Sequence, residues 1–508
     1  MKFERSSGIL LHPTSLPSPY GIGDLGPTAF QWVDFLEQSR CSLWQVLPLG
    51  PTGYGDSPYQ SFSSFAGNPY LVSPQQLLQA GLLQPGDLED KPHFLTDKVD
   101  YGRVIPWKVD LLRRAYDRFV QANFRELGQE FENFQEQQAA WLEDFALFMA
   151  LKDEHGGAPW PKWEAPLRDR DPTALQEARK THAEAIRRQK FRQFLFFHQW
   201  KTLRDYANQR DIRIIGDVPI FVAHDSADVW AHTDLYYLDK EGNPTFVAGV
   251  PPDYFSPTGQ LWGNPLYRWD VHARNGYQWW LSRLRAVLQL VDIIRLDHFR
   301  GFAGYWEVPA SEPTAENGQW VPGPGKEFFA SVKQGLGELP LIAEDLGEIT
   351  PDVIEMREAF DLPGMKILQF GFEGDRDFLP HNYPQNCVAY TGTHDNNTTR
   401  GWYQSMPESI RDFCRRYLGS HEQDVVWEMI RAIWMSVAVF AVAPMQDFLD
   451  LGSQARMNFP GRPSGNWTWR MPEGTLKGYL AKRIKGYNSL YGRGLEEVKE
   501  PEQQPESP

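Results

Sequence analysis

The stretch "VDIIRLDHFRG" at residues 291–301 determines how the rest of the chain is interpreted. Its first six residues are mostly β-branched or leucine, which predicts a buried strand. An arginine nevertheless lies inside the stretch and an Asp-His pair follows, although buried charges are costly unless they are paired. Because side chains alternate along a strand, Arg295 and Asp297 share one face. The pattern therefore predicts a strand that carries an ion pair at its C-terminal end.

Seven further apolar segments resemble this one in length. Most are separated from the next by a segment of helical periodicity, and eight such strands predict a (β/α)8 TIM barrel. A doubly wound open sheet is the alternative, because both folds contain buried parallel strands. The seven segments are residues 8–13, 43–49, 212–221, 339–346, 364–370, 387–395 and 437–449, the last of which could begin as a helix.

The spacing of the strands predicts insertions. The second and third strands lie too far apart for one crossover helix, and residues 50–190 between them contain strongly helical segments. A second insertion at residues 222–271 is rich in Pro, Gly, Trp and Tyr and includes a loop at 249–256. We expect residues 1–495 to form a single barrel with inserted, mostly helical subdomains. The acidic, Pro-rich residues 496–508 are typical of a disordered tail.

Composition narrows the class of ligand and the compartment. A net charge of −15 argues against a polyanionic partner such as nucleic acid, and 19 Trp among 508 residues favour a ligand that stacks on flat side chains. Cys41, Cys387 and Cys414 are far apart and lack metal spacing. The N-terminus does not resemble a secretory signal, and the apolar run at 433–445 is too short to span a bilayer. We expect a soluble cytoplasmic protein that does not bind a membrane.

Acidic residues recur where the predicted strands end. They are Asp217, Asp297, the pair Glu344-Asp345, and Asp395. Strands disfavour Asp and Glu, and the C-terminal ends of barrel strands meet on one face. Any one of these residues alone could be a cap or a structural ion pair. Together they predict an active site at that face.

The surroundings of two carboxylates suggest different protonation states. Arg295 favours the charged form of Asp297, and an ionised carboxylate can act as a nucleophile. Glu344 lies among Ile342, Ala343 and Leu346. An apolar setting with neighbouring anions raises the pKa of a carboxyl group, which suits a general acid. One charged and one protonated carboxyl group is the arrangement that glycoside cleavage needs.

Four motifs carry a resemblance to a known family. They are "DVPIFV" (217–222), "IRLDHFRG" (294–301), "AEDLG" (343–347) and "YTGTHDNNT" (390–398). They resemble the four conserved regions of the 4-α-glucanotransferases, which are the amylomaltases or disproportionating enzymes of glycoside hydrolase family 77 in the α-amylase clan. The resemblance runs from "GILLHPTSLPSPYGIGDLG" (8–26) to "PSGNWTWR" (463–470). It implies a barrel without the C-terminal β-sandwich of other clan members.

The resemblance implies a function and a catalytic set. The enzyme would move α-1,4-glucan segments from a donor to the 4-OH of an acceptor glucan or glucose, with retention of configuration through a covalent β-glycosyl-enzyme intermediate. Asp297 would be the nucleophile, Glu344 the general acid and base, and Asp395 the transition-state stabiliser. Retention requires the carboxyl groups of Asp297 and Glu344 to lie roughly 5–5.5 Å apart.

The resemblance also implies binding residues. Arg295 and His394 would hold the cleaved glucose and the nucleophile, and residues 249–256 would form a lid over the acceptor side. Tyr54 and Tyr101 would belong to a more distant, secondary glucan site. The remaining substrate contacts implied are Ser57, Tyr59, Asp217, Asp253, Gln260, Trp262 and Asn466.

Several residues in these motifs have plainer interpretations. Asp345 is expected to make a structural hydrogen bond, His298 to have a structural or supporting role, and Tyr70 to pack within its loop. The run "DVPIFVAHDS" lacks the Asn-His pair that often accompanies calcium in α-amylases. We therefore expect no metal and no cofactor, and a monomeric enzyme.

Three other functions use the same residues. The first is an α-1,4-glucan hydrolase with the same carboxylates. The second treats the acids at the strand ends as ligands for Mg²⁺, which prefers oxygen donors. The third is a non-catalytic glucan-binding protein, against which the intact set of acids argues.

Overall fold

The computed structural model describes residues 3–122, 124–252, 256–462 and 464–495. Its main sheet has eight parallel strands in the order β10-β11-β12-β1-β2-β3-β6-β9. These are β1 (Ser6–Leu10), β2 (Leu43–Gln45), β3 (Arg213–Pro219), β6 (Ile293–Asp297), β9 (Leu341–Ala343), β10 (Gly364–Ile367), β11 (Cys387–Tyr390) and β12 (Phe440–Pro444).

The two outer strands of this order meet and bring the sheet round into a barrel. The Ala343 N–H at the end of β9 donates to the Pro363 carbonyl, immediately before β10, over 2.9 Å. The predicted (β/α)8 barrel is thus confirmed, and the open sheet is not formed. Each of the eight predicted segments overlaps one barrel strand, and seven contain theirs entirely; β1 begins at Ser6, two residues before its predicted segment. In the last segment the front half is β12, and Met445–Phe448 form the short helix α17.

Helices follow most barrel strands, and their apolar faces are buried against the sheet. Helix α1 begins with proline at its first position, which suits a helix N-terminus because that N–H has no partner within the helix. The helices outside the insertions are α1 (Pro27–Gln38), α10 (Gln278–Leu290), α11 (Gly325–Leu336), α12 (Pro351–Ala359), α13 (Leu368–Glu373), α14 (Thr399–Ser405), α15 (Glu408–Leu418), α16 (Val425–Met435) and α18 (Gly478–Tyr491).

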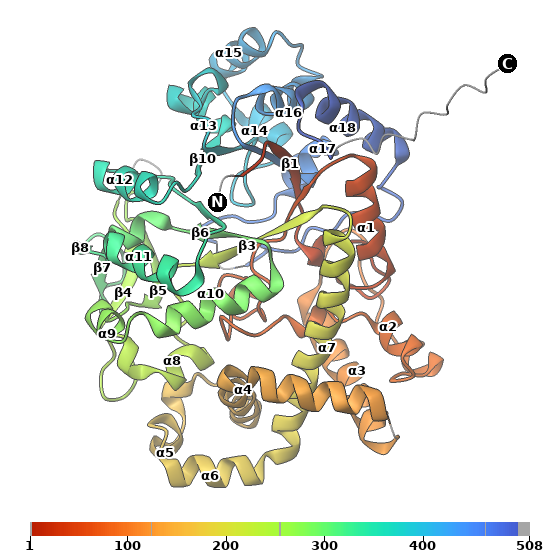
Figure 1. Cartoon of the computed structure of the whole chain (residues 1–508), viewed down its shortest axis with the longest axis vertical. Helices are drawn as coiled ribbons and strands as arrows, with labels where there is room; N and C mark the ends of the chain where they lie inside the picture. Colours follow the sequence, from red (N-terminus) through yellow and green to blue (C-terminus); the bar gives the residue numbers. More distant parts are fainter. Residues whose placement is uncertain (1–2, 123, 253–255, 463, 496–508) are drawn as a thin grey trace, which may run out of the picture.

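The insertion after β2 is helical, as expected. Figure 1 shows α3 to α6 gathered below the barrel strands β3 and β6, with α7 leading back toward β3. Trp200 on α7 donates its Nε1–H to the Leu290 carbonyl over 2.8 Å and so joins the insertion to α10. The inserted helices are α2 (Pro74–Gln79), α3 (Tyr101–Gln121), α4 (Arg125–Glu154), α5 (Ala165–Arg168), α6 (Pro172–Thr181) and α7 (Ala183–Asn208).

A second, antiparallel sheet was not predicted. It has four strands in the order β5-β4-β7-β8, which are β4 (Phe246–Val250), β5 (Gln260–Pro265), β7 (Gly304–Pro309) and β8 (Gln319–Pro322). Two of them lie in the insertion after β3, where α8 (Ala227–Ala231) and α9 (Trp269–Arg274) also lie, and two follow β6. The expectation of mostly helical insertions is therefore incomplete. These strands are short and rich in Gly and Pro, and they pair between segments that are distant in sequence.

The chain beyond the barrel contains no further sheet. After β12, the described residues form helices and loops, which agrees with the predicted absence of a β-sandwich. Within the described ranges, no helix is both long and apolar enough to cross a membrane.

Candidate active site

The ion pair at the end of β6 has a second carboxylate as partner. In the parallel register, Arg295 of β6 lies opposite Asp217 of β3. The Nη1 atom of Arg295 contacts the Asp217 carboxylate and also lies 3.0 Å from Asp297 Oδ1. The Arg295 side chain is only 4% exposed and that of Asp217 is fully buried. Two carboxylates and a guanidinium therefore share one buried network, which is what makes charge tolerable inside the barrel.

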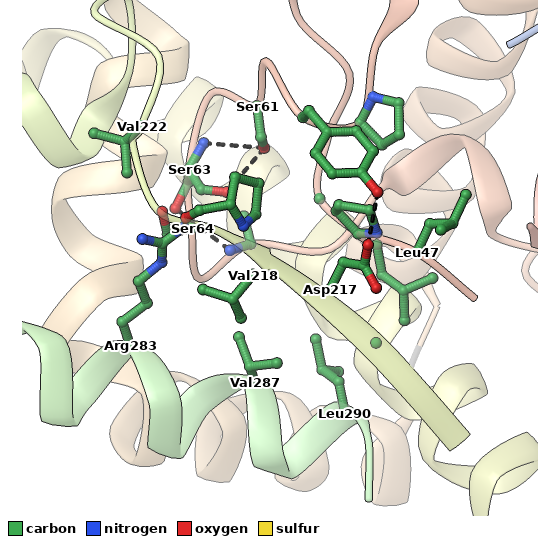
Figure 2. A pocket seen from close by; sticks show the side chains of 18 of the residues that line it. Leu47, Ser61, Ser63, Ser64, Asp217, Val218, Val222, Arg283, Val287 and Leu290 are labelled. Carbon is green, nitrogen blue, oxygen red and sulfur yellow. Dashed lines mark hydrogen bonds between the residues drawn. The ribbon is translucent and has the colours of Figure 1, made fainter. Parts of the chain in front are cut away.

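The loop after β2 covers this network. Tyr59 donates its hydroxyl to Asp217 Oδ2 over 2.7 Å, and its ring stacks on His394 with centroids 5.2 Å apart. Figure 2 shows Ser61, Ser63 and Ser64 of this loop on one side of β3 and residues of α10 on the other. Only a small cavity of about 60 Å³ remains between them. The packing fixes Tyr59 above the ion pair.

The left-handed backbone conformation of His298 helps to hold the side chain of Glu344 in place. His298 directly follows β6 with φ of 54°, a conformation that costs a non-glycine residue about 1–3 kcal/mol. Its backbone N–H donates to Glu344 Oε2 over 2.7 Å. The next N–H, of Phe299, donates to the Glu344 carbonyl over 3.0 Å. The turn after the Asp297 strand thus holds the carboxyl group of Glu344 beside it.

Asp345 points elsewhere, as its predicted structural role requires. Its Oδ1 accepts the Met365 N–H of β10 over 2.7 Å, and its other oxygen pairs with Arg357. Gly364 leaves room for this carboxylate, because a Cβ at that position would collide with it. Asp345 therefore joins β9 to β10 where the barrel closes.

Burial and neighbouring charge set the protonation of the two central carboxyl groups. Burial, with the charge of Asp297 added, raises the pKa of Glu344 well above its ordinary value. Burial also raises the pKa of Asp297, and Arg295 opposes that rise. The effect of Arg295 has the expected sign, and burial acts against it. Burial and the charge of Asp297 therefore both favour the protonated form of Glu344.

Asp395 is held by a loop from the far end of the chain. Asn458 donates its Nδ2–H to Asp395 Oδ1 over 2.6 Å, and Arg456 donates to the Asp395 carbonyl over 2.5 Å. His394 Nε2 lies 3.4 Å from Asp395 Oδ2. The Asp395 side chain remains 44% exposed, so its carboxylate is open to a ligand.

A cavity of about 280 Å³ joins these groups. Of the predicted residues, its lining includes Ser57, Tyr59, Gln260, Trp262, Asp297, His394 and Asp395. Asp217, Arg295 and Glu344 are not in the lining, but each is bonded to a residue that is. Asp217 accepts the Tyr59 hydroxyl, Arg295 pairs with Asp297, and Glu344 accepts the His298 N–H. Within the described residues, no group of three His, Cys, Asp or Glu side chains is placed to hold a metal ion.

Asn466 also acts from outside the cavity. Its Oδ1 accepts the Phe459 N–H and its Nδ2 donates to the Arg462 carbonyl, each over 2.9 Å. These bonds shape the loop whose Pro460 and Gly461 line the cavity. The predicted contact of Asn466 with the substrate stays a prediction.

The remaining predicted positions are partly described. Tyr101 is 6% exposed, and its hydroxyl donates to the Trp467 carbonyl over 3.0 Å. Asp253 lies outside the described residues, as do positions 254 and 255 of the predicted lid, and the side chain of Tyr54 is not described. The secondary glucan site stays a prediction.

Several residues of the cavity lining were not predicted as substrate contacts, among them His298, Asn458 and Trp467. A structural or supporting role was expected for His298, which follows the end of β6, and its ring meets Trp262 edge-on at 4.8 Å. Trp467 lies beside Asn466 in a motif already noted, and its ring centroid lies 5.6 Å from that of His394. Asn458 carries no signal in the sequence.

Comparison with known proteins assigns the family. The sequence profile described as 4-alpha-glucanotransferase matches residues 11–476. The chain belongs to this 4-α-glucanotransferase family. It is 52% identical over 495 residues to the 4-alpha-glucanotransferase of Thermus thermophilus, covering 96% of this chain and 98% of the relative. It is 49% identical to that of Synechocystis sp., with 97% and 99% of the two chains covered.

A solved structure agrees in fold. Amylomaltase from Streptococcus agalactiae in complex with acarbose is 37% identical, with a TM-score of 0.94 over 97% of this chain and 100% of that one. As a 4-α-glucanotransferase family member, the chain is an enzyme that transfers α-1,4-glucan segments, and the predicted resemblance is confirmed.

The Arg295 network predicts a change in pH dependence. With Asp297 as the predicted nucleophile, its ionised form is the one that attacks, so its pKa is expected to govern the acidic limb of kcat/KM. In Arg295→Lys, an ammonium cannot span both carboxylates as a guanidinium does. The lysine therefore lowers the pKa of Asp297 less than the arginine does. The pKa of Asp297 rises, and the acidic limb of the profile moves to higher pH. Initial transfer rates measured from about pH 4.5 to about pH 8 check this.

The control for this variant is Arg204→Lys. Arg204 pairs with Asp292 over 2.6 Å at the opposite end of the same strand. Its substitution is expected to leave the pH profile in place. An Arg295→Lys profile that coincides with that of the parent, or moves to lower pH, contradicts the assignment.

Proposed function

We propose that the chain moves α-1,4-glucan segments by a retaining double displacement, with Asp297 as nucleophile, Glu344 as general acid and base, and Asp395 as transition-state stabiliser. The observation that carries the proposal is the pairing of an arginine-bound Asp297 with a Glu344 whose pKa is raised well above its ordinary value. The two residues end neighbouring strands, β6 and β9. Such a difference between two carboxyl groups suits glycoside chemistry.

In the first step, Asp297 attacks the anomeric carbon of the donor. The bond from that carbon to the glycosidic oxygen breaks, and Glu344 gives its proton to the departing 4-oxygen. In the second step, Glu344 takes the proton from the 4-OH of an acceptor, which displaces Asp297 and restores the α-configuration. The carboxyl groups are expected roughly 5–5.5 Å apart, since no water has to fit between them.

The lining suggests how the sugar is held. Tyr59 and Trp262 offer ring faces to sugar C–H groups, and Ser57, His394 and Gln260 offer hydrogen-bonding groups. Arg295, Asp217 and Asn466 position these groups from behind. Asp253 remains part of this proposal by resemblance, and Tyr54 and Tyr101 by resemblance form a second glucan site.

We further infer that maltooligosaccharides and amylose are donors, that glucose serves as an acceptor, and that the enzyme works as a monomer in the cytoplasm. The bound acarbose in the Streptococcus agalactiae relative supports an oligosaccharide ligand. Three buried cysteines without disulfides support a reducing compartment.

Incubation with maltotriose tests the proposed function. The expected products are glucose and a ladder of maltooligosaccharides longer than the substrate, separated by chromatography. Transfer conserves the number of glycosidic bonds, so reducing ends do not increase. Glucose and maltose without longer products would show that water is the acceptor and that the chain is a hydrolase. No turnover at all would favour a binding protein.

A further inference from the structure

A second cavity, larger than that over Asp297, lies between helices of the insertions and the barrel. Its volume is about 500 Å³, within the usual range for ligand sites. Helix α4 forms one side, α10 the other, and the region around α8 and residues 63–65 complete it; these elements neighbour one another in Figure 1. We call it the α4–α10 groove. It shares no lining residue with the cavity of the active site.

Aromatic rings form part of the groove surface. Phe65 and Trp141 are half-buried and stacked, with centroids 6.4 Å apart and planes inclined by 17°. Trp279 supports Phe65 edge-on at 6.1 Å. A flat, partly exposed ring surface suits the C–H face of a sugar.

Amide side chains form the rest of its polar surface. Trp141 donates its Nε1–H to Gln138 Oε1 over 2.8 Å, and Gln138 reaches across to Gln289 of α10 over a long 3.3 Å. Gln278 is exposed, and its side-chain amide has no hydrogen bond within the described residues. These amides present both donors and acceptors to a ligand.

Charged side chains of both signs line the groove, among them Asp234 and Arg285, so the groove presents no single sign of charge. Asp144 pairs with Arg170 over 2.9 Å, and Arg285 donates to the Gly335 carbonyl over 3.0 Å. A ligand of one strong charge is therefore not favoured. The stacked rings, beside amide groups of which that of Gln278 is unbonded within the described residues, favour a neutral ligand rich in hydroxyl groups.

We propose that the α4–α10 groove binds a segment of α-1,4-glucan outside the active site. The choice of α-glucan among neutral polyhydroxyl ligands rests on the glucan transfer function. A long donor held at the groove stays near the barrel opening, because a second attachment raises the effective concentration of the first. The groove also contacts the loop that carries Tyr59, since Ser63 and Phe65 belong to that loop.

The test separates groove binding from active-site binding in an Asp297→Asn background, where glucan is not consumed. Affinity for amylose is measured by mobility in native gels that contain it, and affinity for maltotriose by calorimetry. The double variant Trp141→Ala/Gln278→Ala is expected to bind amylose about tenfold more weakly, as loss of one ring contact and one hydrogen bond implies. Its maltotriose affinity is expected to stay unchanged.

A second variant distinguishes loss of glucan binding from misfolding of the double variant. Ser282 is exposed on α10 and lines the groove, so Ser282→Trp fills the space and leaves the ring stack intact. It is expected to weaken amylose binding in the same way. The matched control is Tyr479→Ala, which removes a 75% exposed ring from α18 and is expected to leave binding unchanged.

The outcomes are distinct. If Ser282→Trp and the double variant both retain the amylose affinity of the control, the groove is not a glucan site. If amylose and maltotriose binding fall together in a variant that still melts like its parent, the effect lies in the active site and the proposal is overturned. The maltotriose product ladder of the groove variants with Asp297 intact is expected to persist. Absence of this product ladder in the parent enzyme would instead reject the proposed function.

Discussion

Replacing Asp297 by asparagine is expected to lower the rate of glucan transfer by at least about 10,000-fold, as removal of a nucleophile does in other covalent enzymes. The amide keeps the shape of the side chain but cannot form the ester with the anomeric carbon. Only one face of the cavity changes, because Tyr59, Trp262 and Asp395 keep their places. Maltotriose binding, measured by calorimetry, is therefore expected to persist within a few-fold of the parent value.

The control for this variant is Asp270→Asn. Asp270 is an exposed carboxylate on α9 that pairs with Arg274 over 3.1 Å, away from the cavity lining. It is expected to retain full activity. An Asp297→Asn enzyme that keeps a tenth or more of the parent rate would place the nucleophile elsewhere. A variant that loses binding and turnover together, with its melting temperature lowered, would indicate a structural role.

Replacing Glu344 by glutamine is expected to divide the reaction into its two steps. The amide cannot give a proton, so transfer from maltooligosaccharides falls by about 100- to 10,000-fold. With α-maltosyl fluoride the first step needs no proton, because fluoride leaves unaided as the bond from the anomeric carbon to Asp297 forms. The second step still needs a base, so the covalent intermediate accumulates. Mass spectrometry is expected to show one maltosyl group on the peptide that contains Asp297.

A small anionic nucleophile, azide, tests the proposed role of Glu344 as general base in the second step. Azide needs no deprotonation, so it is expected to restore turnover of α-maltosyl fluoride by Glu344→Gln and to form an α-glycosyl azide. The same additions are expected to do nothing for Asp297→Asn, which provides the matched comparison. A Glu344→Gln enzyme that responds neither to the fluoride leaving group nor to azide would not have lost its acid and base. Glu344 would then require another role.

The raised pKa of Glu344 explains why these two carboxyl groups can divide the work. Its protonated form is favoured by burial and by the charge of Asp297, and an ionised Asp297 is favoured by Arg295. Forming the covalent intermediate neutralises Asp297, which removes a charge that held the proton on Glu344. Under the proposed mechanism, the general acid of the first step thereby becomes a better base for the second.

Much of the barrel could be predicted because its signals are local. Each barrel strand is a short apolar run, and each run is visible within a few residues. The four strands of the second sheet lacked such a signal. Strands such as β5 and β7 contain Gly, Pro and aromatic residues, which are equally typical of loops. Their pairing is decided by which segments the barrel brings together.

The candidate site likewise has residues that the sequence could predict and residues that it could not. Asp297, Glu344 and Asp395 stand at strand ends, so the fold class alone predicts that they meet. Asn458 could not be predicted, because its bond to Asp395 crosses 63 residues and follows from the path of a loop. The position of His298 in the lining follows from a left-handed backbone angle, which an apolar pattern does not report.

By itself, the sequence determined that there are eight buried strands and that acids lie at or after the ends of four of them, because both are visible in short runs of residues. It also determined that Arg295 and Asp297 share one face, because side chains alternate along a strand. Only the tertiary structure decided that Asp217 lies opposite Arg295, that the N–H of His298 holds Glu344, and that a second cavity opens between α4 and α10. These features depend on register, on a strained turn and on the packing of helices distant in sequence. Such contacts form between segments that are distant in sequence, and the periodicity of a short segment does not predict them.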